Sequence, residues 1–147
     1  MVGITSYGGY IPRYRVSRML IVQNMAWYFP VIMAVAGGEK AVANWDEDSL
    51  SMAVAAAYDC MAGKDRRALD GVYLASTTLP FADRLNAGIV AAALSAPEHG
   101  ATTADFSSCL KAGTTAAMAA IEAIQSGQKN NVLMVAILVL RWSEATT

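Results

Sequence analysis

Cys109 stands where an apolar run typical of a β-strand passes into a helix of small residues. The stretch reads ADFSSCLKAGTTAAMAAI and covers residues 104–121. The N–H groups in the first turn of a helix lack intrahelical partners, so they can stabilise a thiolate or the oxyanion of acyl transfer. Cys109 is therefore a candidate nucleophile for thioester chemistry. The alternative is a small core residue, because free cysteine is often simply buried.

Position alone does not make this cysteine reactive. A helix N-terminus contributes only about 0.3–1 kcal/mol to an adjacent negative charge, so a base such as histidine is normally needed as well. The single histidine, His99, lies in the polar stretch APEHGATT, which favours a surface loop residue. From the residues alone, a nucleophile and a core thiol therefore both remain open.

The other cysteine, Cys60, falls inside a predicted helix, where we expect it in the core. Neither cysteine is part of a CxxC pair, and one histidine adds little, so we expect no metal site. The N-terminus lacks the charged start and apolar run of a secretory signal. A reducing cytoplasm with both thiols free is the expected setting.

The bulk composition fits one domain without an obvious charged partner. The chain has 147 residues, 55% of them hydrophobic and 16% charged, and a formal net charge of −1. This balance provides no basic field for nucleic acid or anionic membrane. The stretch Met19–Gly38 is long enough to span a bilayer, but Gln23 and Asn24 interrupt it and Pro30 would break a helix. We expect a buried segment or one that docks on a partner subunit, and no membrane span.

The elements that must position Cys109 follow from hydrophobic periodicity and from glycine and proline breaks. Strands are predicted at residues 2–6, 71–77, 101–107 and 130–140. Helices are predicted before Pro30 and at residues 45–65, 81–96 and 110–126, the last one stopped by Gly127. Strands that alternate with helices predict an α/β layered fold with a largely parallel or mixed sheet. The nine consecutive apolar residues of the last strand predict a central strand, and a chain that stops there predicts an incomplete unit.

Four stretches, in this order and spacing, carry a resemblance to a known family. They are VGITSYGGYIPRYRV, GEKAVANWDEDSLSMAVAAA, GVYLASTTLPF and ADFSSCLKAGTTAAM. The chain resembles the N-terminal half of the thiolase-fold condensing enzymes, and most closely the hydroxymethylglutaryl-CoA synthases of archaeal type and their bacterial relatives. The resemblance implies a thiolase-like layered α/β half-domain over residues 1–147 without an internal boundary, with a mixed sheet and a buried small-residue helix.

The resemblance also implies an acyltransferase reaction in the cytoplasm. A catalytic cysteine takes an acyl group from coenzyme A, and a second acetyl-CoA, deprotonated at its methyl group, attacks a carbonyl to form a carbon–carbon bond. A glutamate serves as general acid/base, and a histidine from the C-terminal half polarises the acyl carbonyl. The implied substrates are acetyl-CoA and acyl-CoA, with no bound cofactor, and the implied pathway is isoprenoid (mevalonate) synthesis. The implied assembly is a homodimer or a complex with a thiolase and a zinc-ribbon/OB-fold protein.

The sequence departs from this family pattern at two site positions. Thr77 stands where the acid/base glutamate is expected, and threonine does not titrate near neutral pH. Matching the family's KAGT places the catalytic cysteine at Leu110, one position after Cys109, which is about 100° around a helix. The C-terminal half with its histidine is absent, so we expect this chain alone to be inactive.

Two functions follow from these residues. One is an acyl-CoA condensing acyltransferase with Cys109 as nucleophile, and the other is a non-catalytic thiolase-like subunit that binds acyl-CoA or scaffolds a partner enzyme. A β-ketoacyl synthase of the acyl-carrier-protein type is a variant of the first.

Overall fold

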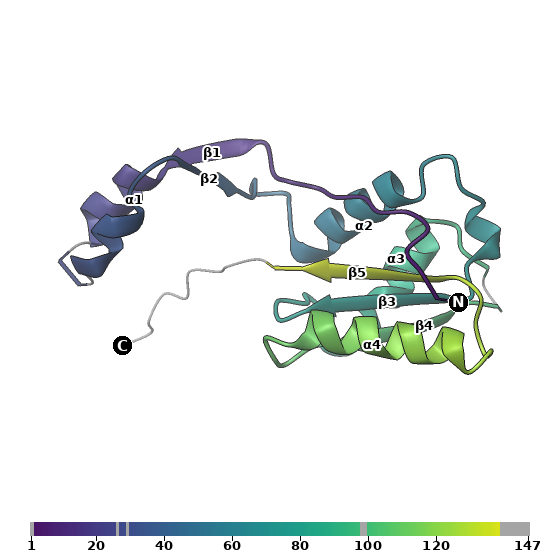
Figure 1. Cartoon of the computed structure of the whole chain (residues 1–147). Coiled ribbons are helices and arrows are strands. Elements are labelled where there is room, and N and C mark those ends of the chain that lie inside the picture. The colour runs from purple at the N-terminus through teal and green to yellow at the C-terminus, as the bar shows by residue number, and fades with distance from the viewer. Residues whose placement is uncertain (1, 26, 29, 98–99, 139–147) are drawn as a thin grey trace. The chain divides into compact units, whose positions relative to one another are not determined.

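The computed structural model describes residues 2–25, 27–28, 30–97 and 100–138. The chain forms two compact units (Figure 1), one from Met1–Tyr10 with Ser49–Thr147 and the other from Ile11–Asp48. The expectation of one half-domain without an internal boundary stays a prediction.

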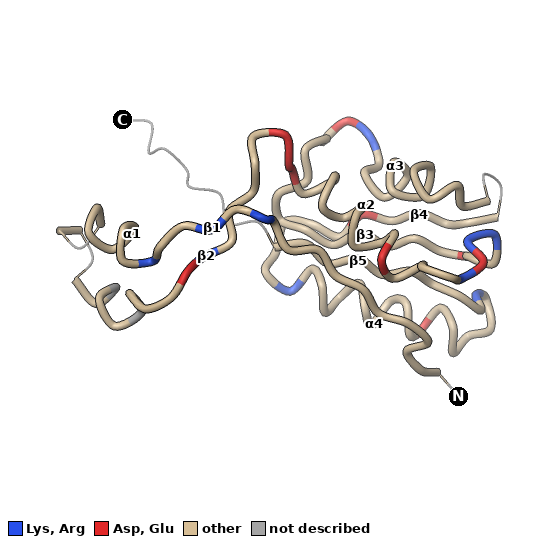
Figure 2. Tube along the Cα trace, turned by 90° about the horizontal axis from the view of Figure 1, so that it is seen from above, with Lys and Arg blue, Asp and Glu red and all other residues tan. Residues whose placement is uncertain are grey.

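The larger unit is a parallel sheet with helices on both of its faces, as Figures 1 and 2 show. The strand order is β4-β3-β5, and both neighbours run parallel to β3. Its strands are β3 (Gly71–Ser76), β4 (Thr102–Phe106) and β5 (Val132–Ile137). Its helices are α2 (Ser49–Cys60), α3 (Asn86–Ala93) and α4 (Ala112–Gln125), with a short 3-10 turn η2 (Arg66–Ala68). These elements confirm the predicted α/β layers.

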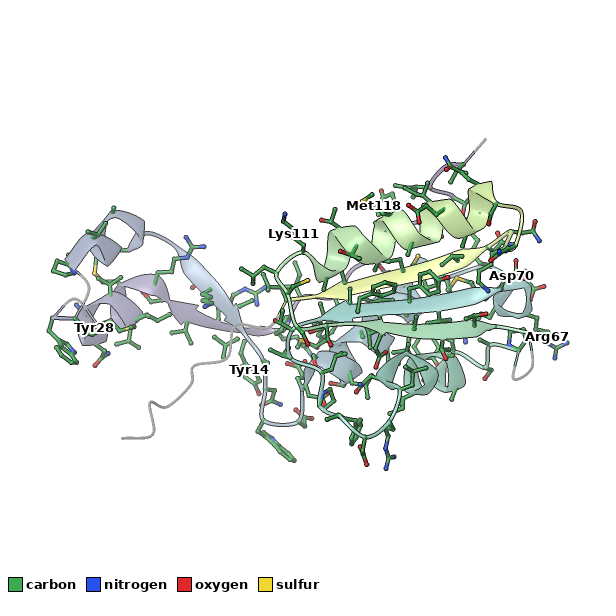
Figure 3. All side chains as sticks on the ribbon, turned by 90° about the horizontal axis from the view of Figure 1, so that it is seen from below. Tyr14, Tyr28, Arg67, Asp70, Lys111 and Met118 are labelled. Atoms are coloured by element: carbon green, nitrogen blue, oxygen red, sulfur yellow. The ribbon has the colours of Figure 1, made fainter. Side chains whose placement is uncertain are left out.

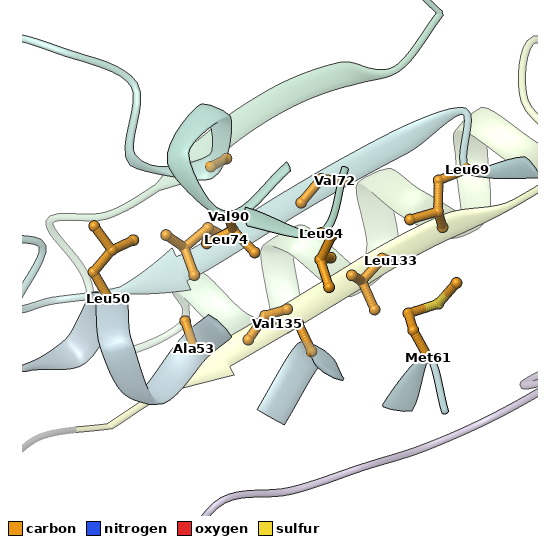
Figure 4. Close-up of a cluster of buried hydrophobic side chains, with 12 residues drawn as sticks. Leu50, Ala53, Met61, Leu69, Val72, Leu74, Val90, Leu94, Leu133 and Val135 are labelled. Carbon is orange, nitrogen blue, oxygen red and sulfur yellow. The ribbon is translucent and has the colours of Figure 1, made fainter. Parts of the chain in front are cut away.

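The main hydrophobic core lies between the sheet and the helices α2 and α3 (Figure 4). Val72 and Leu74 of β3 face this layer and are fully buried, with Leu133 and Val135 of β5 beside them. The alternate residues of β3 face α4, where Ala75 packs against the helix. Because helices cover both faces, all six residues of β3 are buried.

The central strand is β3, whereas we expected the strand within residues 130–140 to be central. Within the described residues β5 pairs only with β3, and its burial alternates because Leu133 and Val135 face the core while Ala136 is exposed. The pairings of this sheet are both parallel within the described residues, which agrees with the first of the two expected alternatives, a largely parallel or a mixed sheet. Antiparallel pairing occurs in the smaller unit instead.

The helix α4 is the predicted small-residue helix, and it buries one face. Ala112, Ala116 and Ala120, each one turn from the next, face the sheet and are buried. Met118 and Ile121 lie on the opposite side and are exposed, and Figure 3 shows Met118 pointing away from the sheet. Only one face of α4 is buried because the sheet of this unit packs against one side of the helix.

The predicted strand at residues 2–6 is wrong, because these residues pair with no strand of the described structure. They lie instead beside the end of α2, where Ser6 Oγ is 3.4 Å from Cys60 Sγ. A glycine is required at position 8, since a Cβ there would lie 2.2 Å from the backbone nitrogen of Cys60. Cys60, which was expected in the core, is half-buried and packs against the core.

The smaller unit is a two-stranded antiparallel ribbon with a helical connection. Its elements are β1 (Tyr14–Ser17), α1 (Arg18–Met25), η1 (Pro30–Val35) and β2 (Glu39–Val42). The helix predicted before Pro30 is confirmed, and proline suits the first position of η1. Trp27 and Tyr28 between the two helices are strongly exposed. Throughout the described ranges, every helix is too short or too polar to cross a membrane.

Candidate functional site

The connections of the sheet create a crevice at the carboxyl ends of β3 and β4. From β3 the chain passes through α3 to β4 on one side, and from β4 through α4 to β5 on the other. Right-handed crossovers then put α3 and α4 on opposite faces, so the two loops diverge where the strands end. An open hollow of about 400 Å³ lies there. It is lined by Thr77, Leu79, Phe81, Ala82, Arg84, Asn86, Asp105, Ser107 and Ser108.

The loop after β3 holds Thr77 at the hollow. The Ser76 hydroxyl accepts a hydrogen bond from the Thr78 N–H at 3.1 Å, and the Ser49 hydroxyl donates to the Thr78 carbonyl at 2.5 Å. Ser49 and Ser76 are both buried. Thr77 therefore lies between the end of β3 at Ser76 and the hydrogen-bonded backbone of Thr78, and its exposed side chain lines the hollow.

A partly buried polar network fixes the other wall of the hollow. The Asp105 carboxylate on β4 accepts from the backbone N–H groups of Asn86 and Ala87, each at 2.7 Å, and from the Asn86 amide at 2.9 Å. These N–H groups belong to the first turn of α3, whose N-cap residue makes no side-chain capping bond. Asp105 therefore caps α3 from a neighbouring strand, where a carboxylate also suits the helix dipole.

Asn86 also holds the loop before α3 in place. Its side chain is only 1% exposed. It accepts from the Phe81 N–H at 3.2 Å and donates to the carbonyls of Phe81 at 2.8 Å and Arg84 at 3.4 Å. Residues 81–86 consequently form a clamped turn that carries the Phe81 and Arg84 side chains into the lining of the hollow.

The corner between β4 and α4 is tightly turned. Ser108 has a φ of +68°, in the left-handed region that non-glycine residues rarely adopt. The Ala112 N–H at the start of α4 donates to the Cys109 carbonyl at 3.1 Å. The Cys109 side chain is exposed, and Leu110 is 92% exposed. The cysteine thus lies at the predicted strand-to-helix corner and outside the hydrocarbon core.

The structure brings only part of the predicted site together. Thr77 lines the hollow with Ser108, the residue directly before Cys109, while neither Cys109 nor Leu110 is among the lining residues. His99 lies outside the described residues. Sequence reasoning did not find Asp105, although a lone carboxylate inside an apolar strand was the available signal.

The opposite end of the sheet carries a different polar cluster, as the positions of Asp70 and Lys111 in Figure 3 show. The backbone N–H groups of Asn130 and Asn131 donate to Asp70 Oδ2 at 2.7 and 3.1 Å. These two hydrogen bonds hold the pKa of the Asp70 carboxyl below its usual value of 3.8. Lys129 Nζ bonds the Asp70 carbonyl at 2.8 Å. This cluster connects the chain just before β3 with the chain just before β5, and it lies away from the hollow.

Comparisons with known proteins identify relatives of this chain and solved structures of the same fold. No family model matches the chain. The hydroxymethylglutaryl-CoA synthase of Methanocella arvoryzae is 35% identical over 143 residues, which are 91% of this chain and 39% of the relative. That of Methanosarcina acetivorans is 38% identical over 133 residues, which are 86% of this chain and 37% of the relative.

Solved structures show the same architecture. MvaS in complex with 3-hydroxy-3-methylglutaryl coenzyme A matches with a TM-score of 0.81 at 22% identity, over 99% of this chain and 36% of that one. The priming β-ketosynthase of the R1128 polyketide pathway matches with a TM-score of 0.78 at 24% identity, over 92% of this chain and 41% of that one.

The chain therefore has the thiolase fold of the condensing enzymes. It is homologous to the archaeal hydroxymethylglutaryl-CoA synthases and spans less than two fifths of their length.

Proposed function

We propose that this chain contributes the cysteine-bearing part of an acyl-CoA condensing acyltransferase of the hydroxymethylglutaryl-CoA synthase type. The observation that carries the proposal is the exposed Cys109 thiol at the β4–α4 corner, next to a hollow at the point where the two loops diverge. The relatedness to archaeal synthases supports the same reaction.

In the proposed first step, Cys109 Sγ attacks the carbonyl carbon of an acyl-CoA. The new carbon–sulfur bond forms as the bond to coenzyme A breaks, and the thiol proton leaves with the coenzyme A sulfur. In this step the transient oxyanion is stabilised by N–H groups in the first turn of α4 other than that of Ala112, which already donates to the Cys109 carbonyl. The acylated cysteine then takes part in carbon–carbon bond formation with acetyl-CoA.

Thr77 occupies the position of the expected general acid/base and contributes a hydroxyl to the hollow. A hydroxyl can orient a carbonyl or a water molecule but does not accept a proton at neutral pH. Asp105 does not supply this function either, because its oxygens already accept three N–H groups. The condensation step therefore needs a base from outside the residues that line the hollow.

The second candidate is a non-catalytic thiolase-like subunit that binds acyl-CoA or scaffolds a partner enzyme. The threonine at position 77 and the exposed leucine at position 110 favour it. In both cases the exposed apolar side of α4, with Met118 and Ile121, suits contact with further protein. A homodimer, or a cytoplasmic complex with a thiolase and a zinc-ribbon/OB-fold protein, is the proposed assembly.

An acylation experiment separates the two candidates. The complete protein is incubated with acetyl-CoA, and its intact mass is measured for the wild type, Cys109→Ala and Cys60→Ala. We expect one acetyl group on the wild type and on Cys60→Ala, and none on Cys109→Ala. Cys60 is the matched control because it is the other free cysteine and lies at the end of α2. An unmodified wild type, under conditions that acylate a known synthase, supports the non-catalytic subunit instead.

A further inference from the structure

The smaller unit has almost no core of its own. In the arm, which is residues 11–42 of this unit, only Val22 and Ala36 are buried among the described residues. The large apolar side chains that the arm exposes are Ile11, Tyr14, Met19, Leu20, Trp27, Tyr28, Val31, Met33 and Val42. A two-stranded ribbon is only marginally stable by itself, because so little burial does not offset the entropy of ordering the chain. The arm therefore needs a surface from outside itself to cover these side chains.

The apolar side chains are concentrated at the tip of the arm, in α1, in η1 and in the turn between them. The sequence from Met19 to Gly38 contains no charged residue. Trp27 and Tyr28 in this turn are 83% and 73% exposed, and Figure 3 shows Tyr28 at the end of the arm. Aromatic residues and methionine are enriched in protein–protein interfaces, and large exposed apolar patches mark interaction sites. The tip therefore has the composition of an interface core.

The charges of the chain are divided unevenly between the arm and the rest of the sequence. Residues 11–42 contain four basic residues and one acidic residue, whereas residues 43–147 contain seven basic and eleven acidic ones. Two arms therefore repel each other, but an arm and the remainder of a second copy attract each other. The larger unit also exposes Met118 and Ile121 on α4, and the one charged residue within that helix is Glu122. This side of α4 matches the tip of the arm in apolar character and complements the charge of the arm.

We propose that the arm of one chain packs on the exposed side of α4 in a second copy of the chain. The exchange is reciprocal, so that each copy gives one arm and receives one, and the two copies form a closed dimer. This inference supplies the interface of the proposed homodimer and rests on that part of the proposed function. It does not require Cys109 to be acylated.

The exposed area at the tip is large enough for a stable dimer. At about 200 Å² for a fully exposed aromatic side chain and about 120 Å² for an aliphatic one, the tip exposes roughly 600 Å² of apolar surface. This value comes from the exposed fractions of Met19, Leu20, Trp27, Tyr28, Val31 and Met33. Because each arm covers a similar area on the other copy, two arms bury roughly 2,400 Å² in total, above the roughly 1,600 Å² of a standard stable interface. One arm alone would bury half of this area, so a reciprocal exchange is favoured.

The test measures the dimer dissociation constant by sedimentation equilibrium for the 147-residue chain and for Trp27→Ser, Met118→Lys and Trp45→Ser. Trp45→Ser is the matched control, because Trp45 is 93% exposed but lies outside the arm. We expect Trp27→Ser and Met118→Lys each to raise the dissociation constant at least about 100-fold, because each change damages both contacts of the dimer. Trp45→Ser should match the wild type. Circular dichroism checks that each variant keeps the fold.

A mixture of Trp27→Ser and Met118→Lys tests whether these two residues meet. A mixed dimer contains one contact in which both the arm and α4 are intact, whereas a dimer of either variant contains none. The losses at two residues in contact are not additive, so the second contact of the mixed dimer loses little more than in either variant alone. We therefore expect the mixture to associate about tenfold more tightly than either variant.

Four results would overturn the inference. A wild type that stays monomeric would remove the dimer, and a dimer that neither variant weakens would place its interface elsewhere. Weakening by both variants without a gain on mixing would show that Trp27 and Met118 do not meet, as in a contact between two arms. If Trp27→Ser leaves a dimer of the complete protein intact, a further part of the polypeptide covers the arm. All four results leave the acylation of Cys109 standing, whereas an unacylated Cys109 in an arm-dependent dimer would remove the enzymatic function alone.

Discussion

Replacing Asp105 by alanine should destabilise the fold through the network that shapes the hollow. The change removes three hydrogen bonds, from the N–H groups of Asn86 and Ala87 and from the Asn86 side-chain amide. Asn86 is 1% exposed, so water replaces these bonds poorly. At about 1 kcal/mol for each bond, plus about 0.5 kcal/mol for the charge at the start of α3, the loss is about 3–4 kcal/mol.

Urea unfolding of the 147-residue chain, followed by circular dichroism, measures this loss of free energy. Asp83→Ala is the control, because the Asp83 side chain is 77% exposed and should change the free energy by less than about 0.5 kcal/mol. Hydrogen exchange should accelerate at the Asn86 and Ala87 amides of Asp105→Ala. If Asp105→Ala were as stable as Asp83→Ala, with unchanged exchange at these amides, the capping argument would be refuted.

Two further predictions concern parts of the larger unit away from the hollow. Asp70→Asn should be less stable than the wild type at pH 6. Because folding lowers the pKa of Asp70, its stabilisation is present above the usual value of 3.8 and is lost as pH falls below it, so acid unfolding curves should converge there. Gly8→Ala should release the N-terminal segment from α2 at a cost of about 1–3 kcal/mol, since its Cβ would lie 2.2 Å from Cys60 N. Faster proteolysis of the segment than in Gly9→Ala, where nothing lies within 4 Å, checks this, and equal rates would contradict it.

The sequence predicted those helices and strands whose own residues show a helix or strand pattern. The apolar run at residues 71–77 became β3, and Gly127, with a φ of +73°, follows the end of α4. The passage from strand to helix at Cys109 was also readable, because apolar residues of period two give way there to small residues of helical spacing. These signals depend only on residues that are near one another in the sequence, and the structure contains the elements that they predict.

Features that depend on residues far away in the sequence could not be predicted from local patterns. The segment at residues 2–6 has strand composition but pairs with no strand in the part of the chain that the structure describes. Strands β1 and β2 form a ribbon from stretches that show little period-two pattern. Asp105 caps a helix that begins 19 residues before it in the chain, so no capping motif is visible near α3. Pairing and capping across the sheet are set by tertiary structure, which overrides local preference.

The most direct test of the account is to locate the acyl group on the complete protein after brief incubation with acetyl-CoA. Peptide mapping by tandem mass spectrometry, with and without neutral hydroxylamine, distinguishes a thioester on cysteine from an ester on serine. The account predicts a hydroxylamine-labile acetyl group on the peptide that contains Cys109. Acetylation confined to Cys60 or to a serine of the corner, or no acetylation where a known synthase is labelled, would contradict it.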